Sequence, residues 1–263
     1  MAKTVKVGII QARAEYYDLP KCVDKAIALI GEAAQQGAQL VTLGETWFPG
    51  YPAWLDYNRD VAQWGHPPTK KLYARLYENS MAIDSPEMAQ LQKVAKQHEI
   101  VLLIGINERV TVGHGNRSLY NSIVTIDATG EIVNHHRKLR PTYTEQMIWA
   151  QGDGAGLQAV DTAVGRVGGL VCWEHWMPHA RQAMHISNEQ SHVAMWPGVI
   201  EAHQIASRHY AFEGRTFVLA AGSIFPVRDM PEGFERDDYL SDKPDMLLLD
   251  GGSAIIAPDG KYI

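Results

Sequence analysis

The sequence has few cysteines and no long apolar run. Only Cys22 and Cys172 occur among its 263 residues, so a disulfide framework is excluded as the basis of the fold. No apolar stretch reaches the roughly 20 residues that a membrane-spanning helix needs. The first residues, MAKTVKVGIIQ, lack both the long apolar core and the small-residue cleavage site of a secretion signal. We therefore expect a cytoplasmic protein without membrane contact.

Excess positive charge is also missing. The formal net charge is −6, and the one dense basic stretch, residues 135–140, is short and interrupted. This charge balance gives no reason to expect a nucleic-acid partner. The apolar fraction of 46% and the charged fraction of 21% are ordinary for a globular protein, and the length suffices for a sizeable core. Without linkers or low-complexity tracts, residues 1–263 predict a single domain.

Apolar β-branched stretches alternate with amphipathic ones, which is typical of an α/β fold with mixed sheets. The predicted strands cover residues 5–12, 39–44, 100–110, 118–126, 131–137, 166–171, 192–196, 216–221 and 252–257. The predicted helices cover residues 21–36, 70–79, 87–98, 178–186 and 201–213. Residues 226–250 are charged and irregular and predict a surface insertion. The sequence stops three residues after the turn 258–260, which predicts a hairpin without its second strand and a truncated C-terminus.

Three segments far apart in the sequence each carry one reactive side chain among glycine, proline and aromatic residues. They are Glu45 in LGETWFPGYP, Lys138 in HHRKLRPTYTE and Cys172 in GGLVCWEHWMP. A thiolate can attack an electrophilic carbon, a carboxylate can move protons, and a fixed cation can stabilise developing negative charge. Together they predict nucleophilic catalysis.

The setting of Cys172 favours a reactive thiol over a buried structural one. It follows a predicted strand and precedes a predicted helix, so the helix N-terminus is expected to lower its pKa. Cys22, by contrast, falls on an amphipathic helical pattern and predicts an inert residue.

Glu45 and Lys138 each have a plain alternative. Aromatic neighbours would desolvate Glu45 and raise its pKa toward that of a general base, but a strand-end glutamate can also be solvated. Lys138 could equally be a surface lysine in a basic patch. Glu145, seven residues on, could pair with Lys138 or with a substrate.

Two other site types fit less well. Cys172, His175 and His179 have a spacing found in zinc sites, but a proline lies between the two histidines and convergence on one ion is doubtful. Residues 152–156 are rich in glycine but no amphipathic helix follows, which favours a turn over a nucleotide site.

The three motifs resemble those of the nitrilase superfamily of carbon–nitrogen hydrolases. HRKLRPTYTEQMIWAQGDG, NEQSHVAMWPG, EGRTFVLAAGS and GGSAIIAPDGK also resemble family segments, and Cys-Trp-Glu is closer to true nitrilases than to the amidase branches. The resemblance implies a four-layer α-β-β-α sandwich with two mixed sheets and no cofactor or metal. It also implies dimers that can extend into spirals, with residues 229–245 and 53–66 at places where nitrilases carry oligomer-forming additions. The family's further C-terminal strands and tail are not found here.

The resemblance assigns roles by position. Cys172 would attack a nitrile carbon, Glu45 would move the protons, and Lys138 with the Trp173 amide would stabilise the tetrahedral centre, while Glu145 supports Lys138. The implied substrate is a small organic nitrile. The implied pocket walls are Tyr51, Trp149, Trp173, Trp176, Trp196 and Pro197.

Two other functions stay open from the sequence. An amidase or carbamoylase of the same superfamily would use the same machinery on a different substrate. A truncated chain could also be an inactive scaffold.

Overall fold

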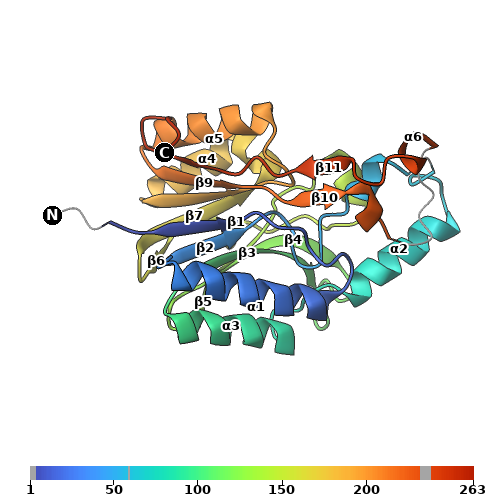
Figure 1. Ribbon diagram of the computed structural model, residues 1–263, viewed down its shortest axis with the longest axis horizontal. Helices are drawn as coiled ribbons and strands as arrows, with labels where there is room; N and C mark the ends of the chain where they lie inside the picture. Colours follow the sequence, from blue (N-terminus) through green and yellow to red (C-terminus); the bar gives the residue numbers. More distant parts are fainter. Residues whose placement is uncertain (1–3, 59, 232–237) are drawn as a thin grey trace.

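Two five-stranded mixed sheets face each other, and helices cover the outer face of each (Figure 1). This computed structural model describes residues 4–58, 60–231 and 238–263. The layers run helix, sheet, sheet, helix, so the predicted four-layer α-β-β-α sandwich is confirmed.

The first sheet has the strand order β1-β2-β3-β4-β5. Its first three strands are parallel, and the last two are added antiparallel as hairpin neighbours. The strands are β1 (Val7–Ile10), β2 (Leu40–Leu43), β3 (Val101–Arg109), β4 (Leu119–Ile126) and β5 (Ile132–Arg137).

The second sheet has the order β12-β9-β8-β7-β6, in which a parallel centre again lies beside antiparallel edges. Its strands are β6 (Val160–Thr162), β7 (Gly165–Val171), β8 (Ser191–Met195), β9 (Phe217–Ala221) and β12 (Ala254–Ile256).

Two of the helices that cover the sheets begin at capping residues that the sequence supplies. Asp18 accepts a hydrogen bond from the Lys21 amide, and Ser85 accepts one from the Met88 amide, each just before a helix with proline in its first turn. Helices α1 (Leu19–Gln35) and α3 (Pro86–His98) cover the first sheet. Helices α4 (Pro178–Ile186) and α5 (Glu201–Gly214) cover the second sheet.

The remaining elements gather at one end of the sandwich, around the carboxyl ends of the parallel strands (Figure 1). The helical ones are η1 (Ala53–Asp56), α2 (Pro67–Glu78), η2 (Tyr143–Met147), η3 (Cys172–Trp176), η4 (Val227–Asp229) and α6 (Asp238–Ser241). Two further strands, β10 (Ile224–Pro226) and β11 (Leu247–Asp250), form an antiparallel pair.

Apolar side chains fill the space between the two sheets. Leu40, Val101 and Leu103 of the first sheet belong to the same core as Leu170 and Val193 of the second. Because both faces of these strands are buried, they are continuously apolar instead of alternating. Among the described residues, no helix is long and apolar enough to cross a membrane.

The segment 226–250 differs from the predicted irregular insertion. Its two ends pair as β10 and β11, so this part of the prediction was wrong. Strand pairing between residues about 20 positions apart leaves no local pattern in a charged, proline-containing stretch. The segments 229–245 and 53–66 each include residues outside the described ranges, and their predicted part in oligomers is not tested.

The C-terminal residues also pair where none was expected. Tyr262 forms an antiparallel bridge with Ile256, and the Ile263 amide donates to the Ile255 carbonyl at 3.0 Å. The residues after the turn 258–260 therefore pair back with β12.

Candidate active site

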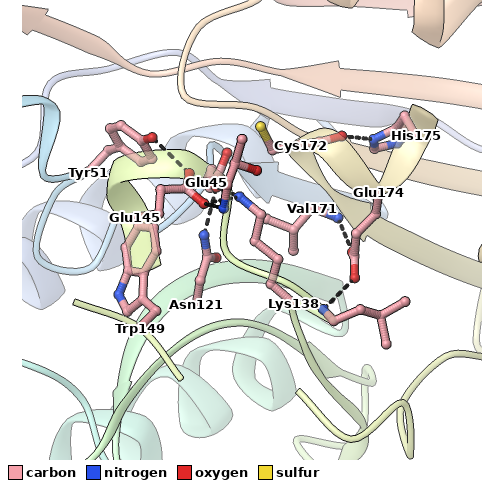
Figure 2. A network of polar contacts seen from close by, with 12 residues as sticks. Glu45, Tyr51, Asn121, Lys138, Glu145, Trp149, Val171, Cys172, Glu174 and His175 are labelled. Carbon is pink, nitrogen blue, oxygen red and sulfur yellow. Dashed lines mark hydrogen bonds and ion pairs between the residues drawn. The ribbon is translucent and has the colours of Figure 1, made fainter. Parts of the chain in front are cut away.

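Three strand ends bring together the three side chains singled out in the sequence. Glu45 follows β2, Lys138 follows β5 and Cys172 follows β7. The Glu45 amide donates to the Trp196 carbonyl at 3.1 Å, and this bond links the first sheet to the residue after β8. Figure 2 shows the side chains converging between the two sheets.

Glu45 is completely buried and only partly hydrogen-bonded. Its Oε1 accepts from Asn121 Nδ2 at 2.6 Å and from Lys138 Nζ at 3.1 Å. Its Oε2 has no hydrogen-bond partner among the described residues. Burial raises the pKa of Glu45 to about 7, although the Lys138 charge and the two hydrogen bonds oppose that rise. The predicted rise of this pKa is confirmed.

Lys138 lies between two carboxylates. Its Nζ donates to Glu145 Oε2 at 2.6 Å and to Glu45 Oε1 at 3.1 Å, and its side chain is fully buried. Burial alone lowers the pKa of Lys138, but the neighbouring Cys172, Glu45 and Glu145 raise it above its ordinary value. The lysine is therefore a permanent cation, and the surface-lysine alternative is excluded.

Glu145 is held by more donors than Glu45. Besides Lys138, its Oε2 accepts from the Thr142 amide at 2.6 Å, and its Oε1 accepts from Tyr51 Oη at 2.8 Å. The backbone contact forms because Glu145 is the third residue of a capping box that opens η2. These bonds fix Glu145 beside Lys138, where the sequence predicted a pair.

Cys172 begins η3 with a φ of 49°, in the left-handed region that a non-glycine residue rarely adopts. This backbone turn directs the side chain out of the sheet toward Glu45 and Glu145 (Figure 2). One oxygen from each glutamate and the Cys172 sulfur all lie within 4.8 Å of one another.

The pKa of the Cys172 thiol differs from the sequence prediction. Burial raises it well above its ordinary value, while the Lys138 charge and a hydrogen bond from the Trp173 amide lower it in part. The expected lowering was wrong because Cys172 starts a single 3-10 turn and α4 begins only at Pro178, so no helix N-terminus offsets the loss of water. A thiol held neutral in this way needs a base, and Glu45 lies beside it.

The acidic and thiol ligands of this cluster do not form an open metal site. The ammonium of Lys138 already donates to both carboxylates and so occupies the position that a cation would take. In the part of the chain that the structure describes, Cys172, His175 and His179 do not gather their ligand atoms, and His175 Nδ1 instead donates to the Cys172 carbonyl at 2.8 Å.

Two positioning residues were missed by sequence reasoning. Asn121 lies on β4 and holds Glu45, and a lone asparagine in an apolar strand was the only signal for it. Glu174 was quoted only as part of Cys-Trp-Glu. Its carboxylate accepts from the amides of Leu139 at 2.8 Å and Val171 at 2.7 Å, which joins the loop after Lys138 to the strand before Cys172.

The six predicted wall residues lie in different surroundings. Tyr51 and Pro197 line a cavity of about 210 Å³ that also includes His203, Leu248 and Leu249. The other four lie outside this cavity lining, and of these Trp149 contacts the cluster. Trp149 packs against Tyr51 and below the Lys138 ammonium, Trp173 is about half exposed and contacts Trp176, and Trp196 is fully buried.

The sequence matches one family model over nearly its whole length, and it is similar to several nitrilases. A family model described as "Carbon-nitrogen hydrolase" matches residues 6–263. An aliphatic nitrilase of Rhodococcus rhodochrous is 35% identical over 98% of this chain and 70% of its own length. A nitrilase of Pseudomonas syringae pv. syringae is 37% identical over 99% of this chain and 76% of its own length. An arylacetonitrilase of Aspergillus niger is 35% identical over the whole of this chain and 79% of its own length.

Solved structures share the fold at lower identity. A carbon-nitrogen hydrolase from Helicobacter pylori G27 superposes with a TM-score of 0.74 at 20% identity, covering 98% of this chain and 83% of its own. An amidase from Nesterenkonia sp. superposes with a TM-score of 0.69 at 18% identity, covering 98% and 84% respectively.

Proposed function

The chain belongs to the carbon–nitrogen hydrolase family, and from this premise we propose that it is a nitrilase, which converts an organic nitrile and two waters to a carboxylic acid and ammonia. The observation that carries the proposal is the free Oε2 of buried Glu45, next to the Cys172 thiol and the Lys138 ammonium. This arrangement supplies a proton acceptor, a nucleophile and a fixed cation in one water-poor site.

In the first half of the reaction, Glu45 takes the thiol proton as the Cys172 sulfur attacks the nitrile carbon. The new C–S bond uses the sulfur electron pair, and one π pair of the C≡N bond moves to nitrogen. Nitrogen then receives the proton from Glu45, which gives a neutral thioimidate. A carboxylate with a pKa of about 7 suits both transfers, because it is partly ionised at neutral pH and returns the proton readily.

In the second half, Glu45 activates a water that adds to the thioimidate carbon. The C–N bond of the tetrahedral centre breaks, and ammonia leaves with the protons it has gained. A second water then cleaves the resulting thioester, which releases the acid and restores the thiol. Lys138 has three N–H donors and two carboxylate partners, so its third donor, with the Trp173 amide, stabilises each tetrahedral centre.

The cavity beside Tyr51 is the proposed place for the rest of the substrate. Its lining combines aromatic and aliphatic side chains from η1, the loop after β8 and β11. A cavity of this kind favours a nitrile with an aryl or branched alkyl group over a small polar one. Turnover of matched aryl, arylacetyl and short aliphatic nitriles measures this preference.

We also propose that the enzyme works as a homo-oligomer in the cytoplasm. The outer face of α5 supports self-association, since Ile205 and Phe212 are more than half exposed there. Light scattering after size-exclusion chromatography distinguishes a dimer or larger assembly from a monomer, which would contradict this part of the proposal.

The test of the proposed function is ammonia release from paired nitriles and amides by wild type and Cys172→Ala. We expect wild type to use each nitrile much faster than the matching amide, and Cys172→Ala to lose all release while keeping its circular dichroism and melting temperature. A Cys172→Ala variant that still releases ammonia from nitriles would contradict the proposal. Ammonia release from amides alone would assign the chain an amidase activity. If folded wild type released no ammonia from nitriles or from amides, the hypothesis of an inactive scaffold would stand.

A further inference from the structure

A second chain of buried polar groups lies behind Cys172 and takes no part in the steps above. His175 Nδ1 contacts the Cys172 carbonyl at 2.8 Å, and His175 Nε2 lies 3.1 Å from His192 Nε2. His192 Nδ1 lies 2.9 Å from Glu189 Oε2, and Tyr210 donates its hydroxyl to Glu189 Oε1. We call His175, His192 and Glu189 the histidine relay.

The hydrogen-bond partners fix the number of protons in the histidine relay. The Cys172 carbonyl can only accept, so His175 Nδ1 carries a hydrogen. One hydrogen lies between the two Nε2 atoms, and His192 Nδ1 carries another because it faces a carboxylate. Three hydrogens on two imidazole rings are one more than two neutral rings hold. The histidine pair therefore carries one positive charge, which the ionised Glu189 balances.

The electrostatics of the relay agree with this count. Burial would raise the pKa of Glu189, but His192, His185 and Tyr210 outweigh it and hold the pKa at about 2, so this carboxylate stays ionised. Burial and the neighbouring His192 lower the pKa of His175 well below its ordinary value.

The surroundings of the relay contain few other ionisable groups. Trp196 stacks on His175, Tyr210 stacks on His192, and His203 lies behind Trp196. Toward the surface, His185 lies 3.6 Å from Glu189 and 3.2 Å from Glu213, which in turn pairs with Arg181. Arg181 also donates to the backbone carbonyl of His175 at 3.1 Å, so among these charged groups it lies nearest to the inner ring.

We propose that the histidine relay positions and polarises the Cys172–Trp173 peptide, so that the Trp173 amide faces the reacting sulfur and the tetrahedral centre as a strengthened donor. His175, His192 and Glu189 are positioning residues in this proposal, since the relay reaches Cys172 only at its backbone carbonyl and not at the reacting side chains of Glu45, Lys138 and Cys172. The inference rests on the proposed function for its effect on turnover, but its proton count stands independently.

The effect passes through a single peptide unit. The carbonyl that His175 holds and the amide that donates to the sulfur belong to the same plane and point in opposite directions. A hydrogen bond to the carbonyl from a cationic pair increases the polarity of that amide. It also fixes the orientation of a peptide whose first residue has the unfavourable φ of 49°.

The decisive variant is Glu189→Gln, which removes the charge and keeps the contacts. The Gln oxygen can accept from Tyr210, and its amide can donate to His192 Nδ1, which then becomes an acceptor. His192 Nε2–H donates to His175, and His175 still donates to Cys172. Every hydrogen bond is retained, but the two rings now hold two hydrogens and are neutral.

Nitrogen-15 NMR of the histidine rings tests the proton count directly. His175→Gln and His192→Gln variants assign the signals of the two rings. In wild type at pH 7.5 we expect three of the four ring nitrogens to be protonated, and in Glu189→Gln only two. Two neutral rings in wild type would overturn the proposal without any variant of Glu189.

Alkylation by iodoacetamide, followed at the Cys172 peptide by mass spectrometry, tests the effect on the thiol. We expect Glu189→Gln to slow alkylation of Cys172 about tenfold at pH 7.5 and to move its midpoint up by about one pH unit. Cys22 is an internal control, because it is buried and stays protected while the fold is intact. An unchanged midpoint at Cys172, or exposure of Cys22, would mean that the relay only supports the fold.

Kinetics on nitriles separates this proposal from the proposed function. Glu189→Gln should lower kcat about tenfold and change KM less than about twofold, because the relay acts on the transition state and not on substrate contacts. A rise in KM with an unchanged kcat would contradict the proposal, because it would mean that the relay acts on substrate binding. If wild type does not hydrolyse nitriles, the proposed function fails, and the NMR and alkylation results still decide the relay.

Discussion

Glu45 and Glu174 lie on two sides of Cys172, both fully buried, and yet their pKa values move in opposite directions. Burial raises the pKa of each. For Glu174 that rise is outweighed by His136, whose Nε2 lies 3.0 Å from both oxygens, and by the amides of Leu139 and Val171. For Glu45 the donors reach one oxygen only, and the pKa stays raised at about 7.

The difference shows what separates a reactive carboxylate from a structural one in the same core. Glu174 has a donor on every side and joins two segments, so its charge is stable and its proton affinity low. Glu45 has a buried oxygen without a partner, which is costly for the fold and available to a proton. Incomplete satisfaction at Glu45, and not burial alone, supports its proposed role as the proton-transfer group.

The largest expected effect comes from Glu45→Gln. The amide has nearly the same shape and can keep a contact with Asn121, but it cannot accept the thiol proton. We expect kcat for nitrile hydrolysis to fall about 10³-fold, within the range for loss of a general base, with no fall in melting temperature. Steady-state ammonia release measures the fall.

Glu131→Gln is the matched control, since Glu131 is exposed and precedes β5, whereas Lys138 follows the opposite end of that strand. It should leave kcat unchanged. A Glu45→Gln enzyme within tenfold of wild type would show that another group moves the proton.

The second expected effect is on stability and comes from Glu174→Ala. This change leaves His136 and the amides of Leu139 and Val171 without their acceptor in a dry interior. We expect a loss of about 3 kcal/mol in the free energy of unfolding, as for other broken buried networks. Urea denaturation compares it with Glu131→Ala, which should cost less than about 0.5 kcal/mol. Equal losses in the two variants would refute the structural role of Glu174.

The sequence predicted much of the fold because its central strands are apolar on both faces and α1 and α3 begin at recognisable caps. The loop positions of Glu45, Lys138 and Cys172 followed from strand ends, and their convergence from the family resemblance. Pairing of β10 with β11 was not predictable, since it joins residues across a charged segment.

The protonation state of the site needed the structure. The pKa of Cys172 depends on complete burial and on a 3-10 turn that the local pattern does not distinguish from the start of α4. Likewise, the contacts of Glu174 with Leu139 and Val171 join segments more than 30 residues apart, and Glu189 reaches Cys172 only through two rings. Polar networks of this kind combine distant positions with no common spacing.

The smallest expected effect is a pH dependence of opposite sign at the two glutamates. The folded pKa of Glu45 lies above its ordinary value of 4.5, so ionisation of Glu45 costs stability as pH rises from about 4.5 to about 7. Gln resembles the protonated form. The advantage of Glu45→Gln over wild type in unfolding free energy should therefore grow by about 2 to 3 kcal/mol between pH 5 and pH 8.

Glu174 should behave in the reverse way, because its folded pKa is lowered and its contribution is present above the ordinary value and lost as pH falls through the folded one. Glu174→Gln should be less stable than wild type at pH 8, and the gap should narrow below about pH 4.5. Urea denaturation of both variants across this range measures the two gaps. Suppose that both variants were less stable than wild type at high pH by similar amounts. The number of hydrogen-bond donors around each carboxylate would then not explain the difference between Glu45 and Glu174.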